Sequence, residues 1–503
     1  MQVREVTPKP SPAVAAEPPA PYEGFARMPI AASWRQGRSG KVCAVHDPYS
    51  GETILEIPLA DARDVDEAYR AAAALQPGWA ASTPVERRDV IERASQIAEA
   101  RKDEIVDWLI RESGATRKTA LLEWRFFRDQ LSEHATYAFH ATGRILPSSV
   151  SGKEHRVYRR PVGVVSVITP WNLPLHLSLR SLGPALAVGN AVVLKPACDT
   201  PVTGALLIAK IFEEAGLPPG VLSVIVGQGL DIGDAFLDHP IPRVIAFTGS
   251  TAVGRWVAER CGRNLKRACL ELGGSGPFIV LDDADLDFTV DAAVAGKFVH
   301  QGQLCVAINR ILVDAKIHDT FLDRFAERVR SLRVGDPSDP QTVIGPMINR
   351  SRLDGILRRV DATVAAGARV VLRGQVCGLV LSPIILADVT DDMPGAREEL
   401  FGPVAPVLRF EGDEEAVKIA NATERGLSSA VFTRDVERGL RVAHRLQAVM
   451  THVNDWPLNE EVNGPIGGDE ASGLGRFGGQ WALDALTTYQ WISIQETPRE
   501  YPI

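Results

Sequence analysis

The chain has few cysteines for its length. Six occur among 503 residues, and no two of them form a Cys-x-x-Cys pair. Small secreted proteins that are held together by disulfides are much richer in cysteine, so a disulfide framework is not expected. No His-Glu-x-x-His string occurs either, and the sequence therefore gives no support for a metal site.

Long apolar runs and blocks of one charge are also absent. The most apolar stretch, residues 162–182, is interrupted by Pro170, Asn172, Pro174 and Arg180, which argues against a membrane span. The net charge is −8 with both signs interspersed, and no Lys/Arg block predicts a nucleic-acid surface. The first residues lack the apolar core of a secretory signal. We therefore expect a cytoplasmic protein with neither a membrane nor a nucleic acid as its partner.

The composition of the chain and the spacing of its apolar residues change several times along its length. Residues 1–25 are rich in Pro and Ala and are expected to be a disordered lead-in. Residues 62–139 show apolar positions at helical spacing. Beyond residue 161, short β-branched runs alternate with helical segments, which predicts parallel sheets with helical crossovers. The runs are 162–169, 191–195, 221–226, 244–248 and 278–281, followed by 310–313, 370–372 and 429–433.

One of these helical segments is well marked at both ends. Thr200 is expected to cap it, Pro201 to occupy its first position and Gly216 to end it. The two series of strands predict an α/β protein with two Rossmann-like units, and a ligand site is expected near their junction.

Three short strings carry side chains suited to acyl chemistry. They are TPWNLP with Asn172, ELGG with Glu271 and GQLC with Cys305. A thiolate attacks a carbonyl carbon, a carboxylate activates a thiol or a water, and an amide donates a hydrogen bond to the developing oxyanion. Taken singly, each residue has an ordinary alternative: a buried apolar cysteine, an ion-paired acid and a turn-forming asparagine. The three together favour an enzyme that works through a thioester.

A cofactor site is indicated by weaker signals. The string GSTAVG at residues 249–254 follows a predicted strand and opens a helix, where backbone N–H groups suit a pyrophosphate. Lys195 ends another strand and is suited to hydrogen-bond a ribose, although a lysine at a strand end is usually solvated. Glu399 is a candidate for the second ribose.

In this order, the strings TPWNLP, FTGSTAVG, ELGG, GQLC, EELFGP and SGLGRFGG resemble the aldehyde dehydrogenase superfamily over nearly the whole chain beyond about residue 30. The resemblance implies a nucleotide-binding domain at 26–139 and 161–273 and a catalytic domain at 274–470. It also implies an oligomerisation segment at 140–160 and 485–496, and hence a homodimer or homotetramer.

The resemblance also implies roles for individual residues. Cys305 would form a thiohemiacetal and then a thioester, Asn172 and the backbone N–H of Cys305 would hold the oxyanion, and Glu271 would activate water. The residues implied to bind NAD or NADP are Thr169, Pro170, Trp171, Lys195, Cys198, Gly229, Gly249, Ser250, Gly254, Leu272, Glu399 and Phe401. The implied substrate pocket comprises Leu173, His176, Leu177, Arg180, Val299, Leu304, Val306 and Ile466.

Two positions depart from the family pattern. Cys198 stands where many NAD-preferring members carry a glutamate that binds the adenosine ribose, so NADP remains an alternative to NAD. Ile466 replaces an aromatic residue of the substrate tunnel.

Several motifs are most similar to the benzaldehyde/vanillin branch and favour an aromatic aldehyde as substrate. Arg180 resembles an arginine that binds the carboxylate of succinic semialdehyde, so a semialdehyde dehydrogenase is one alternative. A structural role for Arg180 is the other reading and is slightly favoured. A CoA-acylating relative is disfavoured by the presence of Glu271, and a non-catalytic relative by the intact Cys305, Glu271 and Asn172.

Overall fold

The computed structural model describes residues 19–459 and 461–502. Most of the predicted lead-in, residues 1–18, lies outside these ranges. The last residues of the predicted lead-in pack against the residue 104–108 segment. The Tyr22 backbone N–H donates to Glu104 Oε1 at 2.7 Å, and the buried Phe25 ring meets Trp108 edge-on at 5.2 Å. The packed chain therefore begins before residue 25.

The predicted helical block is a set of four helices. They are α1 (Ala62–Ala81), α2 (Pro84–Ala100), α3 (Lys102–Ser113) and α4 (Arg117–His140). Side chains of Asp61, Thr83 and Thr116 cap the first, second and fourth, each accepting hydrogen bonds from N–H groups of the first turn. Gly114 ends α3 in the left-handed region, with φ of 68°.

The first large sheet has six strands in the order β23-β11-β10-β7-β8-β9. Its strands are β7 (Val164–Ile168), β8 (Ala191–Lys195), β9 (Leu222–Val224), β10 (Val244–Thr248), β11 (Arg267–Glu271) and β23 (Gly473–Leu474). Five are parallel, and only β23 joins the β11 edge antiparallel. The strand order reverses between β7 and β10, and such a switch point is where open α/β sheets bind ligands at their carboxyl edge.

The helix expected after β8 forms, but its start is capped differently from the prediction. It runs as a π-helical turn, η1 (Val202–Leu206), into α6 (Leu207–Glu214). The Glu112 carboxylate accepts the backbone N–H groups of Val202 and Thr203 at 2.8 and 2.7 Å, while the Thr200 hydroxyl makes no capping bond. The Thr200 cap prediction is wrong because a buried carboxylate from α3 takes its place. That burial raises the pKa of Glu112 to about 7.

The second large sheet has seven strands in the order β14-β17-β18-β13-β12-β20-β21. They are β12 (Pro277–Val280), β13 (Arg310–Asp314), β14 (Arg369–Leu372), β17 (Ile384–Ala387), β18 (Val404–Phe410), β20 (Ser428–Phe432) and β21 (Met450–Val453). The predicted strand at 370–372 pairs antiparallel at the edge, and the other strands are parallel. The prediction of two Rossmann-like α/β units is confirmed.

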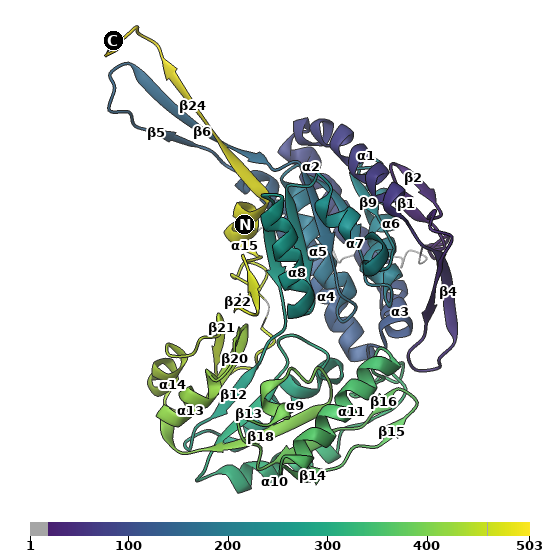
Figure 1. Ribbon diagram of the computed structural model, residues 1–503, viewed down its shortest axis with the longest axis vertical. Helices are drawn as coiled ribbons and strands as arrows, with labels where there is room; N and C mark the ends of the chain where they lie inside the picture. The colour runs from purple at the N-terminus through teal and green to yellow at the C-terminus, as the bar shows by residue number, and fades with distance from the viewer. Residues whose placement is uncertain (1–18, 460, 503) are drawn as a thin grey trace, which may run out of the picture.

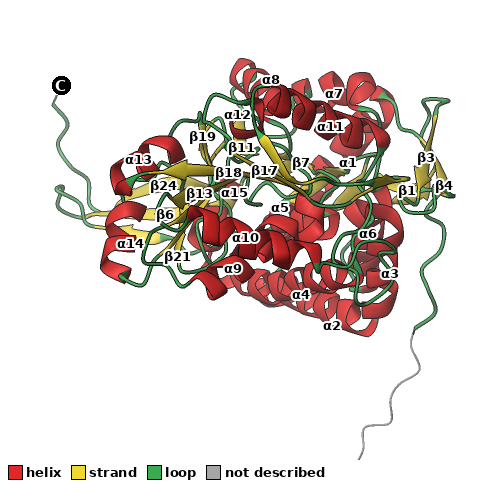
Figure 2. Ribbon diagram, turned by 90° about the horizontal axis from the view of Figure 1, so that it is seen from below, coloured by secondary structure: helices red, strands yellow, loops and turns green. Residues whose placement is uncertain are grey.

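Helices lie on both sides of the strands (Figure 2). Those not yet named are α5 (Pro174–Ala187), α7 (Gly229–Asp238), α8 (Thr251–Arg263), α9 (Leu286–Phe298), η2 (Val299–Gly302), α10 (His318–Arg330), α11 (Arg350–Ala365), α12 (Pro394–Arg397), α13 (Gly412–Ala420), α14 (Val436–Ala443) and α15 (Gly479–Leu486). The short strands are β1 (Met28–Ile30), β2 (Ser33–Arg35), β3 (Val42–His46), β4 (Thr53–Pro58), β15 (Val376–Cys377), β16 (Val380–Leu381), β19 (Arg425–Gly426) and β22 (Asp469–Glu470).

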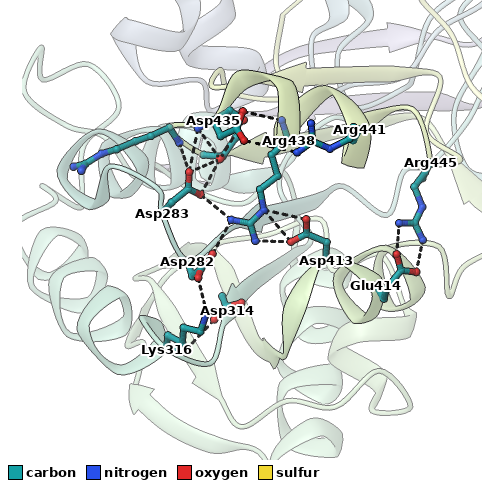
Figure 3. Close-up of polar contacts among 12 residues, drawn as sticks. Asp282, Asp283, Asp314, Lys316, Asp413, Glu414, Asp435, Arg438, Arg441 and Arg445 are labelled. Carbon is teal, nitrogen blue, oxygen red and sulfur yellow. Dashed lines mark hydrogen bonds and ion pairs between the residues drawn. The ribbon is translucent and has the colours of Figure 1, made fainter.

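Ion pairs of Arg438, on α14, hold that helix against the second α/β unit. The Arg438 guanidinium contacts Asp282 at 2.7 Å, Asp283 at 3.2 Å and Asp413 at 2.5 Å (Figure 3). Hydrogen bonds from Lys316 and Arg438 lower the pKa of Asp282 to about 2. One cation thereby joins the loop after β12, helix α13 and helix α14, far from the first sheet.

Three strands form an arm that extends from the first unit (Figure 1). They are β5 (Arg144–Leu146), β6 (Lys153–Pro161) and β24 (Thr487–Gln495), in the order β24-β6-β5. Strand β24 pairs antiparallel with β6 along nine residues, from Thr487 opposite Pro161 to Gln495 opposite Lys153. Two distant parts of the sequence thus make one small sheet, at the positions predicted for the oligomerisation segment.

Candidate functional site

A large cleft opens at the carboxyl edge of the first sheet. Its volume is about 880 Å³, and its walls include the ends of β7, β8, β10 and β11 together with residues of α11 and of the 398–401 segment. Asn172, Glu271 and Cys305 all line it, so the structure brings the three predicted catalytic side chains to one cleft.

Asn172 lies in the loop between β7 and α5. Its side-chain amide donates a hydrogen bond to the backbone carbonyl of Gln303 at 3.1 Å, two residues before Cys305. Helix α5 begins directly after this loop, and the Glu123 carboxylate caps it. Glu123 Oε1 accepts from the N–H groups of Leu175 and His176 at 2.8 and 3.2 Å. Burial raises the pKa of Glu123 to about 8.

Glu271 is the last residue of β11, and its backbone is held from both sides. Its carbonyl accepts the Gly249 N–H at 3.0 Å, and it stands opposite Gly473 of β23. The carboxylate is buried against Gly467, where a Cβ atom would lie 2.7 Å from Glu271 Oε1. Glycine at 467 therefore leaves room for the Glu271 side chain.

Cys305 follows a strained turn at the end of α9. His300, Gln301 and Gly302 adopt left-handed φ angles of 50°, 57° and 71°, and each such non-glycine residue costs about 1–3 kcal/mol. Buried hydrogen bonds hold the turn, since Gln301 Nε2 donates to the carbonyls of Gly114 and Pro346 at 3.1 and 2.9 Å. The Cys305 carbonyl lies against Gly274, where a Cβ atom would come within 2.3 Å of it.

Most of the residues predicted to bind the cofactor line the cleft. They are Thr169, Pro170, Trp171, Lys195, Gly229, Gly249, Ser250, Leu272, Glu399 and Phe401. The rings of Trp171 and Phe401 meet edge to face at 5.6 Å. Glu399 is half-buried, desolvation raises its pKa, and its Oε1 accepts the Gly274 N–H at 3.2 Å. Lys195 is buried at the end of β8, and desolvation lowers its pKa.

Two predicted cofactor residues, Gly254 and Cys198, are not among the residues that line the cleft. Gly254 lies inside α8, where a Cβ atom would come within 2.3 Å of Leu272, so its small size serves packing between helix and loop. The Cys198 thiol lies 3.5 Å from the Gly227 carbonyl and beside Cys43. Its side chain therefore packs behind the cleft wall.

An apolar cluster packs around Cys305. It contains five predicted pocket residues, Leu173, Leu177, Val299, Leu304 and Val306. Sequence reasoning missed its other members, which are Leu122, Ala307, Leu427, Met450, Trp456 and Leu458. They come from α4, from the chain just after Cys305, from the residue before β20, from the start of β21 and from the segment after β21. Of these six, only Ala307 lies close to one of the predicted strings, two residues after Cys305.

The remaining predicted pocket residues have other neighbours. His176 packs against the Phe126 ring at 5.2 Å, and Ile466 is bridged antiparallel to Phe477. Arg180 is buried in α5, with its guanidinium 5.4 Å from the Phe477 ring centre and Nη2 donating to Thr248 Oγ1 at 3.4 Å. Sequence reasoning also missed Asn349, Arg352 and Arg425, which line the cleft.

Within residues 19–459 and 461–502, no helix is both long enough and apolar enough to cross a membrane. Over the same ranges, His, Cys, Asp and Glu side chains form no group of three or more that would suit a metal ion.

Comparisons with known proteins agree with this geometry. The chain is 46% identical over 481 residues to benzaldehyde dehydrogenase YfmT of Bacillus subtilis, which covers 96% of this chain and 99% of that protein. It is 47% identical over 470 residues to a vanillin dehydrogenase of Corynebacterium glutamicum, covering 93% of this chain and 97% of the relative.

A crystal structure of an NAD-dependent benzaldehyde dehydrogenase from Corynebacterium glutamicum superposes with a TM-score of 0.87 at 45% identity, covering 94% of this chain and 99% of that one. The model of the aldehyde dehydrogenase family matches residues 34–492. The resemblance inferred from the six strings is thus confirmed, and the chain belongs to the aldehyde dehydrogenase family.

Proposed function

We propose that the protein oxidises an aromatic aldehyde, of the benzaldehyde or vanillin kind, to its carboxylic acid with NAD as the hydride acceptor. The observation that carries this proposal is the position of Cys305, which lines the large cleft and also contacts the apolar cluster. A thiol there has a cofactor-sized space on one side and a desolvated, mostly hydrocarbon surface on the other. The names of the three relatives described above support the same substrate class.

In the proposed mechanism, the Cys305 thiolate adds to the carbonyl carbon of the aldehyde. The resulting oxyanion accepts hydrogen bonds from the Asn172 side chain and the Cys305 backbone N–H. NAD, when bound, would supply the hydride acceptor that converts this adduct into a thioester to Cys305. Glu271 then takes a proton from the water that attacks the thioester, which releases the acid and the thiol.

The described cleft fits a dinucleotide. Its volume lies within the range of cofactor sites, and Gly249 and Ser250 precede helix α8, whose first N–H groups suit a pyrophosphate. Lys195 and Glu399 would bind the two riboses, and Trp171 and Phe401 would flank the nicotinamide end. The half-buried Glu399 carboxylate has acceptor capacity beyond its bond to the Gly274 N–H and would accept a ribose hydroxyl.

A semialdehyde is the alternative substrate class. It needs a cation that reaches the substrate carboxylate, and Arg180 is the candidate from the sequence. The Arg180 guanidinium is engaged with Phe477 and Thr248, which favours a bracing role and supports the aromatic substrate.

We also propose that the arm pairs copies of this chain into a homodimer or homotetramer. Large apolar side chains are exposed on its three strands, among them Ile145 at 74% and Trp491 at 66%. An exposed sheet with such side chains is a surface suited to association. All six cysteines are free thiols, which fits the proposed cytoplasmic location.

The test is an activity panel on the purified protein. Benzaldehyde, vanillin and succinic semialdehyde are each offered with NAD⁺ and with NADP⁺, and the reduced cofactor is measured by absorbance. The proposal expects the highest kcat/KM for an aromatic aldehyde with NAD⁺ and no turnover by Cys305→Ala. A strong preference for succinic semialdehyde would overturn the aromatic substrate assignment in favour of a semialdehyde. Turnover by Cys305→Ala within about tenfold of the parent would overturn the mechanism.

A further inference from the structure

Two thiols from distant parts of the sequence meet behind the cleft wall. Cys43 lies on β3 with its side chain buried, and its sulfur donates to the Cys198 backbone carbonyl at 3.4 Å. The two thiols are also close enough for each to shift the pKa of the other. The Cys198 side chain is half-buried, just after β8. The contact of the Cys43 sulfur with the Cys198 backbone brings the two residues side by side, which a disulfide requires.

The surroundings of the pair give the two thiols different reactivity. The interaction with the Cys43 thiol lowers the pKa of Cys198, and the charge of Lys195 lowers it further, while burial and Asp199 oppose both. The same interaction raises the pKa of Cys43. Because the thiolate is the nucleophile, Cys198 is the thiol that attacks and Cys43 the one that resolves.

The pair is connected to the cleft through the segment that carries Cys198. Lys195 and Ala197 line the cleft on one side of Cys198. On the other side, Asp199 Oδ1 accepts a hydrogen bond at 3.0 Å from Asn349 Nδ2, and Asn349 also lines the cleft. A covalent bond that draws Cys198 towards β3 would therefore shift groups at two places in the wall.

We propose that Cys43 and Cys198 are a peroxide-sensitive thiol pair whose reversible disulfide weakens dinucleotide binding. The Cys198 thiolate attacks hydrogen peroxide and becomes a sulfenic acid as hydroxide leaves. The Cys43 thiol then attacks that sulfur, the S–S bond forms, and water leaves. The two thiols lose two electrons and the peroxide gains them, and a dithiol reductant reverses the reaction. The effect on the dinucleotide rests on the cofactor site proposed above, whereas the thiol chemistry does not.

The first experiment detects the bond itself. The protein is treated with hydrogen peroxide, digested without reduction and analysed by mass spectrometry. We expect a linked peptide pair containing Cys43 and Cys198, which disappears on reduction and is absent from Cys43→Ser. Cys261→Ser, which removes a different buried thiol, should still form the linked pair. Absence of the linked pair from a parent sample in which Cys305 is already oxidised would overturn the proposal.

The second experiment measures the consequence in Cys305→Ser, so that oxidation of the catalytic thiol cannot contribute. NAD⁺ is titrated into reduced and into oxidised protein by calorimetry. We expect the Kd to rise about tenfold on oxidation, the size of one lost hydrogen bond to a charged group. Reduction should restore the original Kd, and the Cys43→Ser, Cys305→Ser double variant should show no rise.

Equal NAD⁺ affinity of the linked and the reduced protein would overturn the coupling to the cleft. Failure of the reduced protein to bind NAD⁺ would instead overturn the proposed cofactor site together with the coupling. Mass spectrometry decides the disulfide independently of both results.

Discussion

The side-chain amide of Asn172 donates a hydrogen bond to the backbone carbonyl of Gln303 at 3.1 Å. The residue proposed to hold the oxyanion is thereby tied to the loop that carries the proposed nucleophile. One N–H of the amide serves this bond, and the other is available to a substrate oxygen in the proposed mechanism.

Replacement of Asn172 by alanine should lower kcat by about 10²–10³, because one oxyanion donor is lost. The dissociation constant for NAD⁺ should change much less, since the cofactor residues are not altered. Steady-state kinetics and a cofactor titration on the same preparation check both expectations. A variant with unchanged kcat would exclude Asn172 from the oxyanion site.

Replacement of Glu271 by glutamine should separate the two halves of the reaction. The amide cannot accept a proton from water, so thioester hydrolysis should slow while the first turnover proceeds. Rapid mixing should then show a burst of NADH close to the enzyme concentration, followed by slow turnover. Cys305→Ala is the control and should give no burst. Loss of the burst in Glu271→Gln would place Glu271 in the earlier step, at the thiol.

Replacement of Glu123 by glutamine should reduce the dependence of stability on pH. The pKa of Glu123 is raised from 4.5 to about 8, so the folded protein holds this proton more tightly than the unfolded chain. The resulting stability is fully present below pH 4.5 and is lost as the pH rises through about 8. Over that window the free energy of unfolding should fall by at most about 1.4 kcal/mol per pH unit from this group.

The glutamine variant keeps an oxygen for the two N–H groups that Glu123 Oε1 accepts and has no proton to lose. Denaturant unfolding of parent and variant at several pH values measures the difference. Relative to the parent, the variant should gain stability as the pH rises. Parallel curves for the two proteins would mean that Glu123 titrates normally in the folded state.

Replacement of Arg180 by methionine should lower the activity on all aldehydes together. The side chain braces α5 against Thr248 and Phe477, and loss of a buried bond to a charged group costs about 1–3 kcal/mol of stability. Thermal unfolding and kcat/KM for benzaldehyde and succinic semialdehyde check this. A selective loss with succinic semialdehyde, at unchanged Tm, would assign Arg180 to a substrate carboxylate.

Local sequence patterns predicted the main helices and strands and the reactive side chains. The cap of η1 and several members of the apolar cluster depend on long-range contacts and could not be predicted in this way. The strand at 191–195 coincides with β8 because its residues up to Lys195 are all apolar, and Val192 and Val193 among them are β-branched. The cap of η1 could not be predicted, because Glu112 reaches it from 90 positions away. Trp456 and Leu122 join the cluster around Cys305 for the same reason, since nothing in their own segments indicates that neighbour.

The antiparallel pairing of β23 with β11 has a consequence for the order of folding during synthesis. Strand β11 ends at Glu271, but its edge partner lies at Gly473, and α15 joins the same core. The whole second sheet must leave the ribosome before that edge is covered. Until then the backbone N–H and C=O groups at the β11 edge are unpaired and can bind a strand of another chain, which favours aggregation. The first unit is therefore expected to reach its final form only after the second has emerged.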